Sequence, residues 1–243
     1  MSERLPPAAE PEDHLGMTDE QWAWFQTCTH GYGEQDENGV DVSLLRENLR
    51  LTPTQRVEKL LQALPLDPRC QVVASKRSFR DLLAPLHAHN VSYVLMGVFA
   101  MACHGSAYVA DHIDLACACE PNSLAALAEA LALLHPRVRG APEDLPFVLD
   151  ARALRSGANL TLVTDAGNVD LLGDISGADS FEMLWKRSME MDLFGVPVRV
   201  ASLEDLIAMK RAGGRPWDQL HLMELERLHR LLAENKPSNP EGE

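Results

Sequence analysis

The stretch from Tyr93 to Asp114, YVLMGVFAMACHGSAYVADHID, constrains the possible folds of this chain more than any other. It predicts a buried strand over residues 93–96, a tight turn at Gly97 and a short apolar helix, because apolar runs interrupted by glycine are typical of alternating strands and helices. Gly105 is expected to end that helix, and a second strand follows from Ile113. The second strand, in HIDLACACE, alternates poorly, which favours a central position with both faces covered.

Acidic side chains are expected to gather on one side of this sheet. Asp114 projects from the second strand, and Asp170 in GNVDLL projects from a later strand. Residues at i and i+2 of a strand face the same side, so His112 shares the face of Asp114, whereas Asp111 is expected to point to the opposite face. Such a group beside a glycine–serine turn suits phosphoryl chemistry assisted by a divalent metal, which prefers oxygen ligands.

The charge of the chain excludes some classes of partner. Its 22 Lys and Arg residues against 36 Asp and Glu give a formal net charge of −14, whereas bulk binding to nucleic acid or acidic lipid needs a basic face. No apolar run is long enough to span a bilayer, and no secretory signal is visible at the N-terminus. The five cysteines show no CxxC pair, which indicates reduced thiols. We therefore expect a cytoplasmic protein that takes nucleotide only as a small ligand.

Composition divides the chain into four segments. Residues 1–40 are expected to be disordered or loosely docked, because their first half is rich in Pro, Glu and Asp. Residues 41–77 are predicted to form a helical arm, in which Thr52 caps a helix. Residues 78–234 are predicted to form the main domain, and residues 235–243 form a tail.

The pattern of the main domain predicts an α+β fold, a small mixed sheet flanked by helices, with the helical arm as an N-terminal extension. Residues 135–146 are expected to form a loop. Leu160–Thr164 is predicted to be a strand, which a turn over residues 165–168 returns into the strand VDLL as a hairpin. Ser202 with Asp205 predicts a capping box at the start of the helix LEDLIAMKR.

Three segments, in this order, resemble the nucleotidyltransferase fold of the DNA polymerase beta superfamily. They are YVLMGVFAMACHGSAYVADHIDLAC, GNVDLLGDISG and VRVASLEDLIAMKRAGGRPWDQLHLMELERL. Within the superfamily the chain looks like the small bacterial branch related to minimal nucleotidyltransferases and to abortive-infection nucleotidyltransferase toxins. The likeness extends from about Asn90 to Leu232.

The resemblance implies transfer of a nucleoside monophosphate from a nucleoside triphosphate to an acceptor, with Mg²⁺ or Mn²⁺ as the cofactor. It implies that Asp114, Asp170 and His112 are the catalytic and metal-binding residues. It also implies that four further residues contact the nucleotide: Gly97, Gly105, Ser106 and Lys210. A protein partner is a further implication of the toxin-like branch.

The chain departs from the family pattern at five positions. His112 stands where the family has the first Asp of DID, Tyr108 and Ala110 stand for an Arg and a Thr, Val98 for the second glycine of a pair, and Trp217 for a Lys. Imidazole is a neutral ligand where magnesium prefers charged oxygen. The alternative interpretation is a catalytically inactive module of the same fold that binds nucleotide or a partner, or a toxin–antitoxin component by analogy with the family.

Overall fold

The computed structural model describes residue 18 and residues 34–63, 76–108, 112–142, 147–155, 159–173, 177 and 180–234. Asp111, most of the predicted disordered segment and the predicted tail lie outside these residues. The backbone divides into two compact units, residues 1–43 and 44–243. The predicted boundaries of the helical arm, 41 and 77, stay predictions.

The described part of the first unit is a turn closed by an isolated bridge between Gln35 and Asp41. The side chain of Asp36 accepts hydrogen bonds from the backbone N–H groups of Asn38, at 2.9 Å, and Val40, at 3.0 Å. An aspartate that bonds the backbone two residues ahead stabilises a tight turn.

The rest of the described chain contains both helices and strands, as predicted for an α+β protein. Their bounds are α2 (Val42–Leu49), α3 (Pro53–Ala63), α4 (Lys76–Ala88), β1 (Tyr93–Met96), α5 (Gly97–His104), β2 (His112–Cys117), α6 (Pro121–Ala132), β3 (Arg137–Val138), α7 (Ala151–Leu154), β4 (Leu160–Thr164), β5 (Gly167–Leu172), α8 (Phe181–Arg187), β6 (Met189–Leu193), β7 (Val196–Val200), α9 (Leu203–Gly213) and α10 (Pro216–Glu234).

The strands form one mixed sheet of seven strands in the order β3-β4-β5-β2-β1-β7-β6. β2 pairs in parallel with β5, and β1 pairs in parallel with β7, while the other neighbours are antiparallel. The position of β2 in the middle of the sheet explains its poor alternation, because a central strand is covered on both faces. The predicted mixed sheet flanked by helices, with a helical N-terminal extension, is confirmed.

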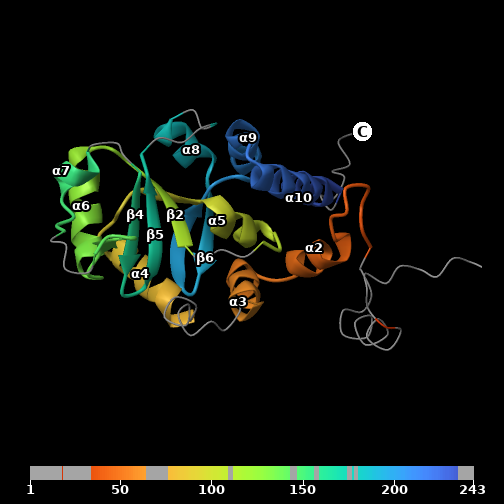
Figure 1. The fold of residues 1–243 in the computed structure, drawn as a ribbon, viewed down its shortest axis with the longest axis horizontal. Coiled ribbons are helices and arrows are strands. Elements are labelled where there is room, and N and C mark those ends of the chain that lie inside the picture. Colours follow the sequence, from red (N-terminus) through yellow and green to blue (C-terminus); the bar gives the residue numbers. More distant parts are fainter. Residues whose placement is uncertain are drawn as a thin grey trace, which may run out of the picture. The chain divides into compact units, whose positions relative to one another are not determined.

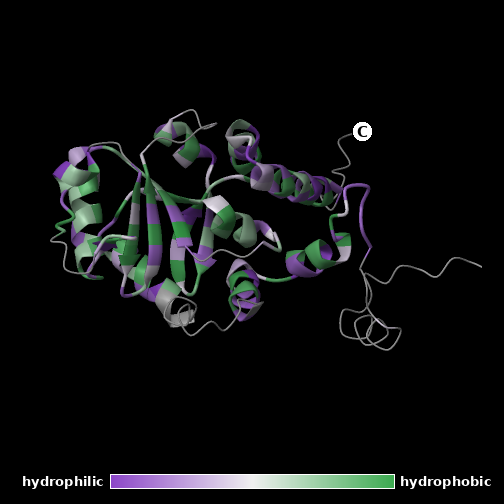
Figure 2. Cartoon of the chain, in the orientation of Figure 1, coloured by the Kyte–Doolittle hydropathy of each residue, from purple (hydrophilic) through white to green (hydrophobic). Residues whose placement is uncertain are grey.

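Helices cover the sheet on both sides of its central strands. In Figure 1, α6 and α7 lie to the left of the strands, and α5 and α9 lie to their right. α5 contacts β1 and β2, and α4 contacts β7 and α6. The core is apolar, with Leu83, Leu86 and Leu95 fully buried. Figure 2 shows hydrophobic colour over most of the sheet, interrupted by hydrophilic bands on β2 and β5.

Local sequence signals set several of the helix ends. The hydroxyl of Ser202 accepts a hydrogen bond from the N–H of Asp205 at 3.1 Å, which confirms the predicted cap of α9. Gly214 follows α9 in the left-handed conformation, with φ +62°, and Pro216 opens α10. Pro at the first helical position has no N–H to leave unpaired.

Two sequence predictions about strands were wrong in detail. The predicted loop over residues 135–146 contains the two-residue strand β3, which pairs with β4. The strand predicted to begin at Val169 begins at Gly167, because Gly167 and Asn168 pair with the end of β4. The turn between β4 and β5 is therefore shorter than predicted.

Within the described ranges, no helix combines the length and the apolar character needed to cross a bilayer.

Candidate functional site

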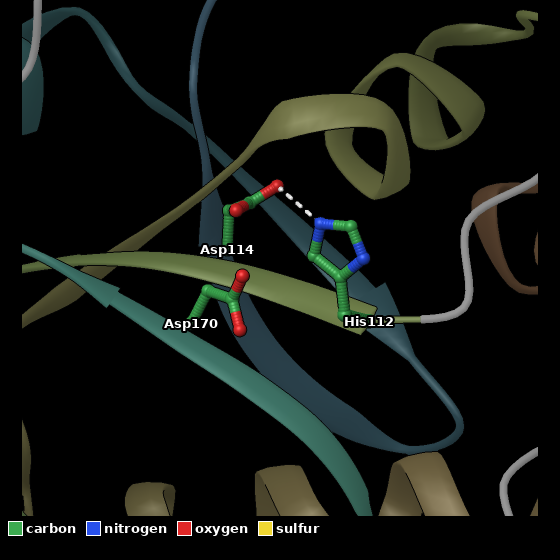
Figure 3. A group of neighbouring side chains, drawn as sticks. All are labelled: His112, Asp114 and Asp170. Atoms are coloured by element: carbon green, nitrogen blue, oxygen red, sulfur yellow. Dashed lines mark ion pairs between the residues drawn. The ribbon is translucent and has the colours of Figure 1, made fainter. Parts of the chain in front are cut away.

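Three side chains predicted to form one site converge in the structure. Figure 3 shows His112 and Asp114 on β2 and Asp170 on the neighbouring strand β5, with their side chains on the same side of the sheet. One ligand atom of each lies within 4.8 Å of those of the other two. His112 Nε2 lies 3.5 Å from Asp114 Oδ2, and the side chains of both aspartates are 15% exposed. Their role as metal ligands stays a prediction.

Strand register produces this convergence. Asp114 lies directly opposite Asp170 in the parallel pairing of β2 with β5, and opposite residues of paired strands project to the same face. Ile113 and Val169, which precede the two aspartates, are fully buried. A slip of one residue in either strand would turn a carboxylate into the core, so burial of the apolar face fixes the geometry of the site.

Gly97 brings the start of α5 against the Asp114 carboxylate. Met96 pairs with Asp114 across β1 and β2, so α5 begins beside that side chain. A Cβ on Gly97 would overlap Asp114 Oδ2, and Gly97 has a φ of +64°. The first turn of a helix carries unpaired N–H groups and the positive end of the macrodipole, which favours negative charge at this position. The predicted contact of Gly97 with nucleotide stays a prediction.

Arg139, which sequence reasoning missed, also belongs to the site. Its N–H donates to the carbonyl of Thr161 at 2.9 Å, and Thr161 pairs with Asp170. From this position its Nη2 donates to Asp170 Oδ1. Its Nε is buried and has no hydrogen-bond partner among the described residues. The only sequence signal was the alternation Arg137-Val138-Arg139, which is too short to predict a strand.

The Gly105–Ser106 turn is occupied by bonds within the protein. The N–H groups of both residues donate to carbonyls of α5, at 2.9 and 3.0 Å, as in a left-handed helix cap. The Ser106 hydroxyl is buried, accepts from the N–H of Tyr108 at 3.2 Å and bonds the carboxyl of Glu224. Burial raises the pKa of Glu224. A phosphate bound at this turn would have to replace these bonds, and the predicted contacts of Gly105 and Ser106 stay predictions.

Lys210 is held by a buried carboxylate. Its Nζ lies 3.0 Å from Asp218 Oδ1, and the two side chains are 13% and 3% exposed. Asp218 also accepts from Arg215 Nε at 2.8 Å. Burial opposes the ionisation of Asp218, but hydrogen bonds from Arg215 and Lys210 outweigh it and lower the pKa to about 2. These three residues fix the connection between α9 and α10, and the predicted contact of Lys210 with nucleotide stays a prediction.

We expect Asp218→Asn to lower the free energy of unfolding by about 2 kcal/mol at neutral pH, because it leaves a buried ammonium without its counter-charge. The pKa of Asp218 in the folded state, about 2, lies below the ordinary value of an aspartate, about 3.9. The stabilisation is therefore complete above about pH 4 and is lost as the pH falls toward 2. Urea unfolding at several pH values should show that the difference in free energy of unfolding between the natural protein and Asp218→Asn decreases as the pH falls from about 4 toward 2.

Glu226→Gln is the matched control for Asp218→Asn. Glu226 lies on the same helix and pairs with Arg211 at 2.6 Å, but both side chains are exposed. An exposed pair contributes less than about 1 kcal/mol. Equal effects of the two substitutions would show that burial of the Lys210–Asp218 pair has no energetic consequence.

Arg215 places a second cation near the carboxylates. Its side chain is 75% exposed. Hydrogen bonds to Asp218 raise the pKa of its guanidinium, and the negative charge of Asp114 raises it further. The exposed guanidinium of Arg215 is therefore accessible to an anionic ligand. Arginine suits phosphate oxygens because its planar fork offers two donors at once.

Tyr108, at a position where the sequence resemblance led us to expect an arginine, contacts His221. The two rings meet edge to face with centroids 4.3 Å apart. Burial lowers the pKa of His221 to about 4, and the charge of Lys210 lowers it as well. His221 is therefore neutral at physiological pH, so this pair of rings provides no positive charge.

The donor set fits a single divalent ion. Bonds of about 2.1 Å allow opposite ligands of one ion to lie roughly 4.2 Å apart, and the ligand atoms of His112, Asp114 and Asp170 lie within 4.8 Å of one another. The upper limit of 4.8 Å between the ligand atoms exceeds the distance between opposite ligands of one ion by only ~0.6 Å. Rotation of a carboxylate can close this difference. One imidazole and two carboxylates suit Mn²⁺ or Zn²⁺ better than Mg²⁺, because imidazole is a softer ligand.

Comparisons with known proteins give little beyond this geometry. No protein-family model matches the chain, and no curated protein matches its sequence. Solved structures similar to it include the antibiotic-resistance factor ANT(2'')-Ia, which is 19% identical, with a TM-score of 0.43. The match covers 65% of this chain and 85% of that one.

Proposed function

We propose that this chain is a nucleotidyltransferase that binds a divalent metal ion at His112, Asp114 and Asp170 and transfers a nucleoside monophosphate from a nucleoside triphosphate to a hydroxyl acceptor. The observation that supports the proposal most directly is the convergence of these three side chains. The order of the three sequence segments that resemble nucleotidyltransferases supports it independently. The ion identity, the base and the acceptor are the parts of the proposal that the experiments below address.

The residues of the site have distinct roles in this proposal. A bound divalent ion supplies charge neutralisation for the triphosphate and lowers the pKa of a bound hydroxyl. Asp114 and Asp170 would hold the ion from two neighbouring strands, and His112 would complete the ligand set from the same face of β2. Arg215, whose side chain is 75% exposed, binds the phosphate oxygens that point to solvent. Phosphoryl transfer depends mainly on positioning and charge, which such an arrangement provides.

The direct test combines binding with transfer. The purified chain is titrated with Mn²⁺ and Mg²⁺ by calorimetry and then incubated with labelled ATP, CTP, GTP or UTP, an RNA or small-molecule acceptor, and each metal. The proposal expects Mn²⁺ to bind more tightly than Mg²⁺ and to support transfer of label. Absence of metal binding, or binding without transfer to any protein, RNA or small acceptor, would contradict it.

A second candidate function is a nucleotide-binding module without catalysis. The observation that favours it is that both carboxylates already have partners within the protein. Asp114 pairs with His112, and Asp170 pairs with Arg139. A carboxylate that already has a partner in the protein has a lower affinity for a cation, because the incoming ion competes with that partner. Nucleotide binding in calorimetry without label transfer would support this candidate over the first.

His112→Asp discriminates between the two functions. The substitution replaces a neutral nitrogen ligand by a charged oxygen, so we expect Mg²⁺ to bind about 10-fold more tightly. If the natural protein is silent and the variant transfers label with Mg²⁺, the second candidate holds and the scaffold remains competent. His87→Asp is the control, because His87 is exposed on α4 and borders a cavity at the start of β1, the opposite end from Met96. An equal gain from His87→Asp would show that added negative charge alone is sufficient.

A further inference from the structure

Arg139 occupies a position in which its charge acts directly on the site. β4 separates β3 from β5 in the sheet, and the backbone bond of Arg139 to Thr161 places its side chain beside Asp170. The guanidinium reaches Asp170 Oδ1 through Nη2. Its side chain is 32% exposed, so the group lies between the sheet and solvent.

The charges of the site favour one ion over two. With His112 neutral, the ligand set carries two negative charges, from Asp114 and Asp170, and Arg139 cancels one of them. Centres that hold two divalent ions need several carboxylates to offset four positive charges. A second ion beside Asp170 would meet the guanidinium at the same carboxylate, and like charges this close repel strongly.

Arg139 also has a donor that remains to be satisfied. Its Nε is buried and has no hydrogen-bond partner among the described residues, although a buried donor without a partner is costly. A guanidinium holds a carboxylate through one part of its fork and a phosphate oxygen through another without changing its charge. Because Nε is enclosed, a ligand oxygen can reach Arg139 only through the exposed part of its guanidinium, and the side chain is 32% exposed beside Asp170.

We propose that this is a single-ion centre in which Arg139 takes the place of a second cation, holding Asp170 through Nη2 and binding a phosphate oxygen of the nucleotide through the exposed part of its guanidinium. The inference rests on the proposed function, because it requires a metal at His112, Asp114 and Asp170. It identifies the ligand of this guanidinium as the triphosphate, whatever the base. Arg139 is thus a substrate-binding residue that no sequence pattern marked.

The test uses the full chain, Mn²⁺ and inorganic triphosphate as probes, and needs no turnover. Electron paramagnetic resonance of Mn²⁺ gives the number of bound ions, and calorimetry gives the affinity for triphosphate. The natural protein is expected to bind one Mn²⁺ per chain. In Arg139→Gln we expect tighter Mn²⁺ binding or a second bound ion, together with triphosphate affinity weakened by about 10-fold or more. Arg139→Lys should restore the single ion but not the full triphosphate affinity, because lysine has no fork.

Arg137→Gln is the matched control, because Arg137 lies two residues away and is exposed. It removes the same charge and should leave both the ion count and the triphosphate affinity unchanged. Two Mn²⁺ ions in the natural protein, or no change in Arg139→Gln, would overturn the inference while leaving the proposed function intact. No Mn²⁺ binding at all would overturn both, so the two failures are distinguishable.

Discussion

Replacing Gly97 by alanine is expected to weaken metal binding roughly 100-fold and to destabilise the fold by about 3 kcal/mol. The new Cβ would overlap Asp114 Oδ2, and the residue would also have to keep a φ of +64°. The carboxylate has no room to retreat without losing its place opposite Asp170, because the strands fix its backbone. Calorimetry with Mn²⁺ and chemical unfolding measure the two effects.

Gly195→Ala separates the two causes. Gly195 has a φ of +80°, and a Cβ there would meet nothing within 4 Å. It lies in the turn between β6 and β7, so the same backbone strain arises without an overlap. We expect a loss of about 1–2 kcal/mol for this control and unchanged Mn²⁺ affinity. If Gly97→Ala behaves like Gly195→Ala, the close approach of α5 to Asp114 has no part in the site.

Asp114→Asn is expected to lower metal affinity and nucleotidyl transfer by at least about 100-fold. Asp114 is the central ligand, since it lies 3.5 Å from His112 and opposite Asp170. An amide offers one neutral oxygen and turns an N–H donor toward the ion. Stability should stay the same or increase slightly, because the substitution relieves repulsion between two neighbouring carboxylates. Single-turnover transfer assays and thermal unfolding measure the two quantities.

Asp165→Asn is the matched control for Asp114→Asn. Asp165 carries the same charge in the exposed turn before β5, where its carboxylate pairs with the exposed His135 at 2.6 Å. We expect unchanged metal affinity and transfer. If Asp165→Asn also loses transfer, the loss in Asp114→Asn comes from the change in net charge and not from the loss of a metal ligand. A large loss of stability in Asp114→Asn would instead give that residue a structural role.

Local signals allowed much of the fold to be predicted from the sequence. The order of β1, α5 and β2 follows from an apolar run, a glycine and a second apolar run, and the cap of α9 follows from Ser202 and Asp205. His112 and Asp114 lie on the same face of the sheet because side chains two residues apart in a strand point to the same side. These features depend on residues close together in the sequence, so periodicity and caps are sufficient to predict them.

The parts that were not predicted depend on pairing between distant residues. β3 has only two residues, so periodicity gives no signal for it, and the contact of Arg139 with Asp170 arises from the order of three strands. Lys210 was predicted to reach a nucleotide, but a lysine near a helix end does not reveal that a buried aspartate on the next helix will hold it. The burial of Ser106 likewise depends on Glu224, which lies far along the chain.

The two charge pairs of the site come from two different segments. The segment β1–α5–β2 carries His112 with Asp114, and the segment β3–β4–β5 carries Arg139 with Asp170. Each acid therefore has a partner on its own segment, the imidazole of His112 for Asp114 and the guanidinium of Arg139 for Asp170, so neither carboxylate needs a dissolved cation as a partner in the folded chain. In this respect the chain differs from small zinc domains, which are unfolded until metal binds. Cation supply would control what this protein does, while its persistence as a folded molecule would be independent of that supply.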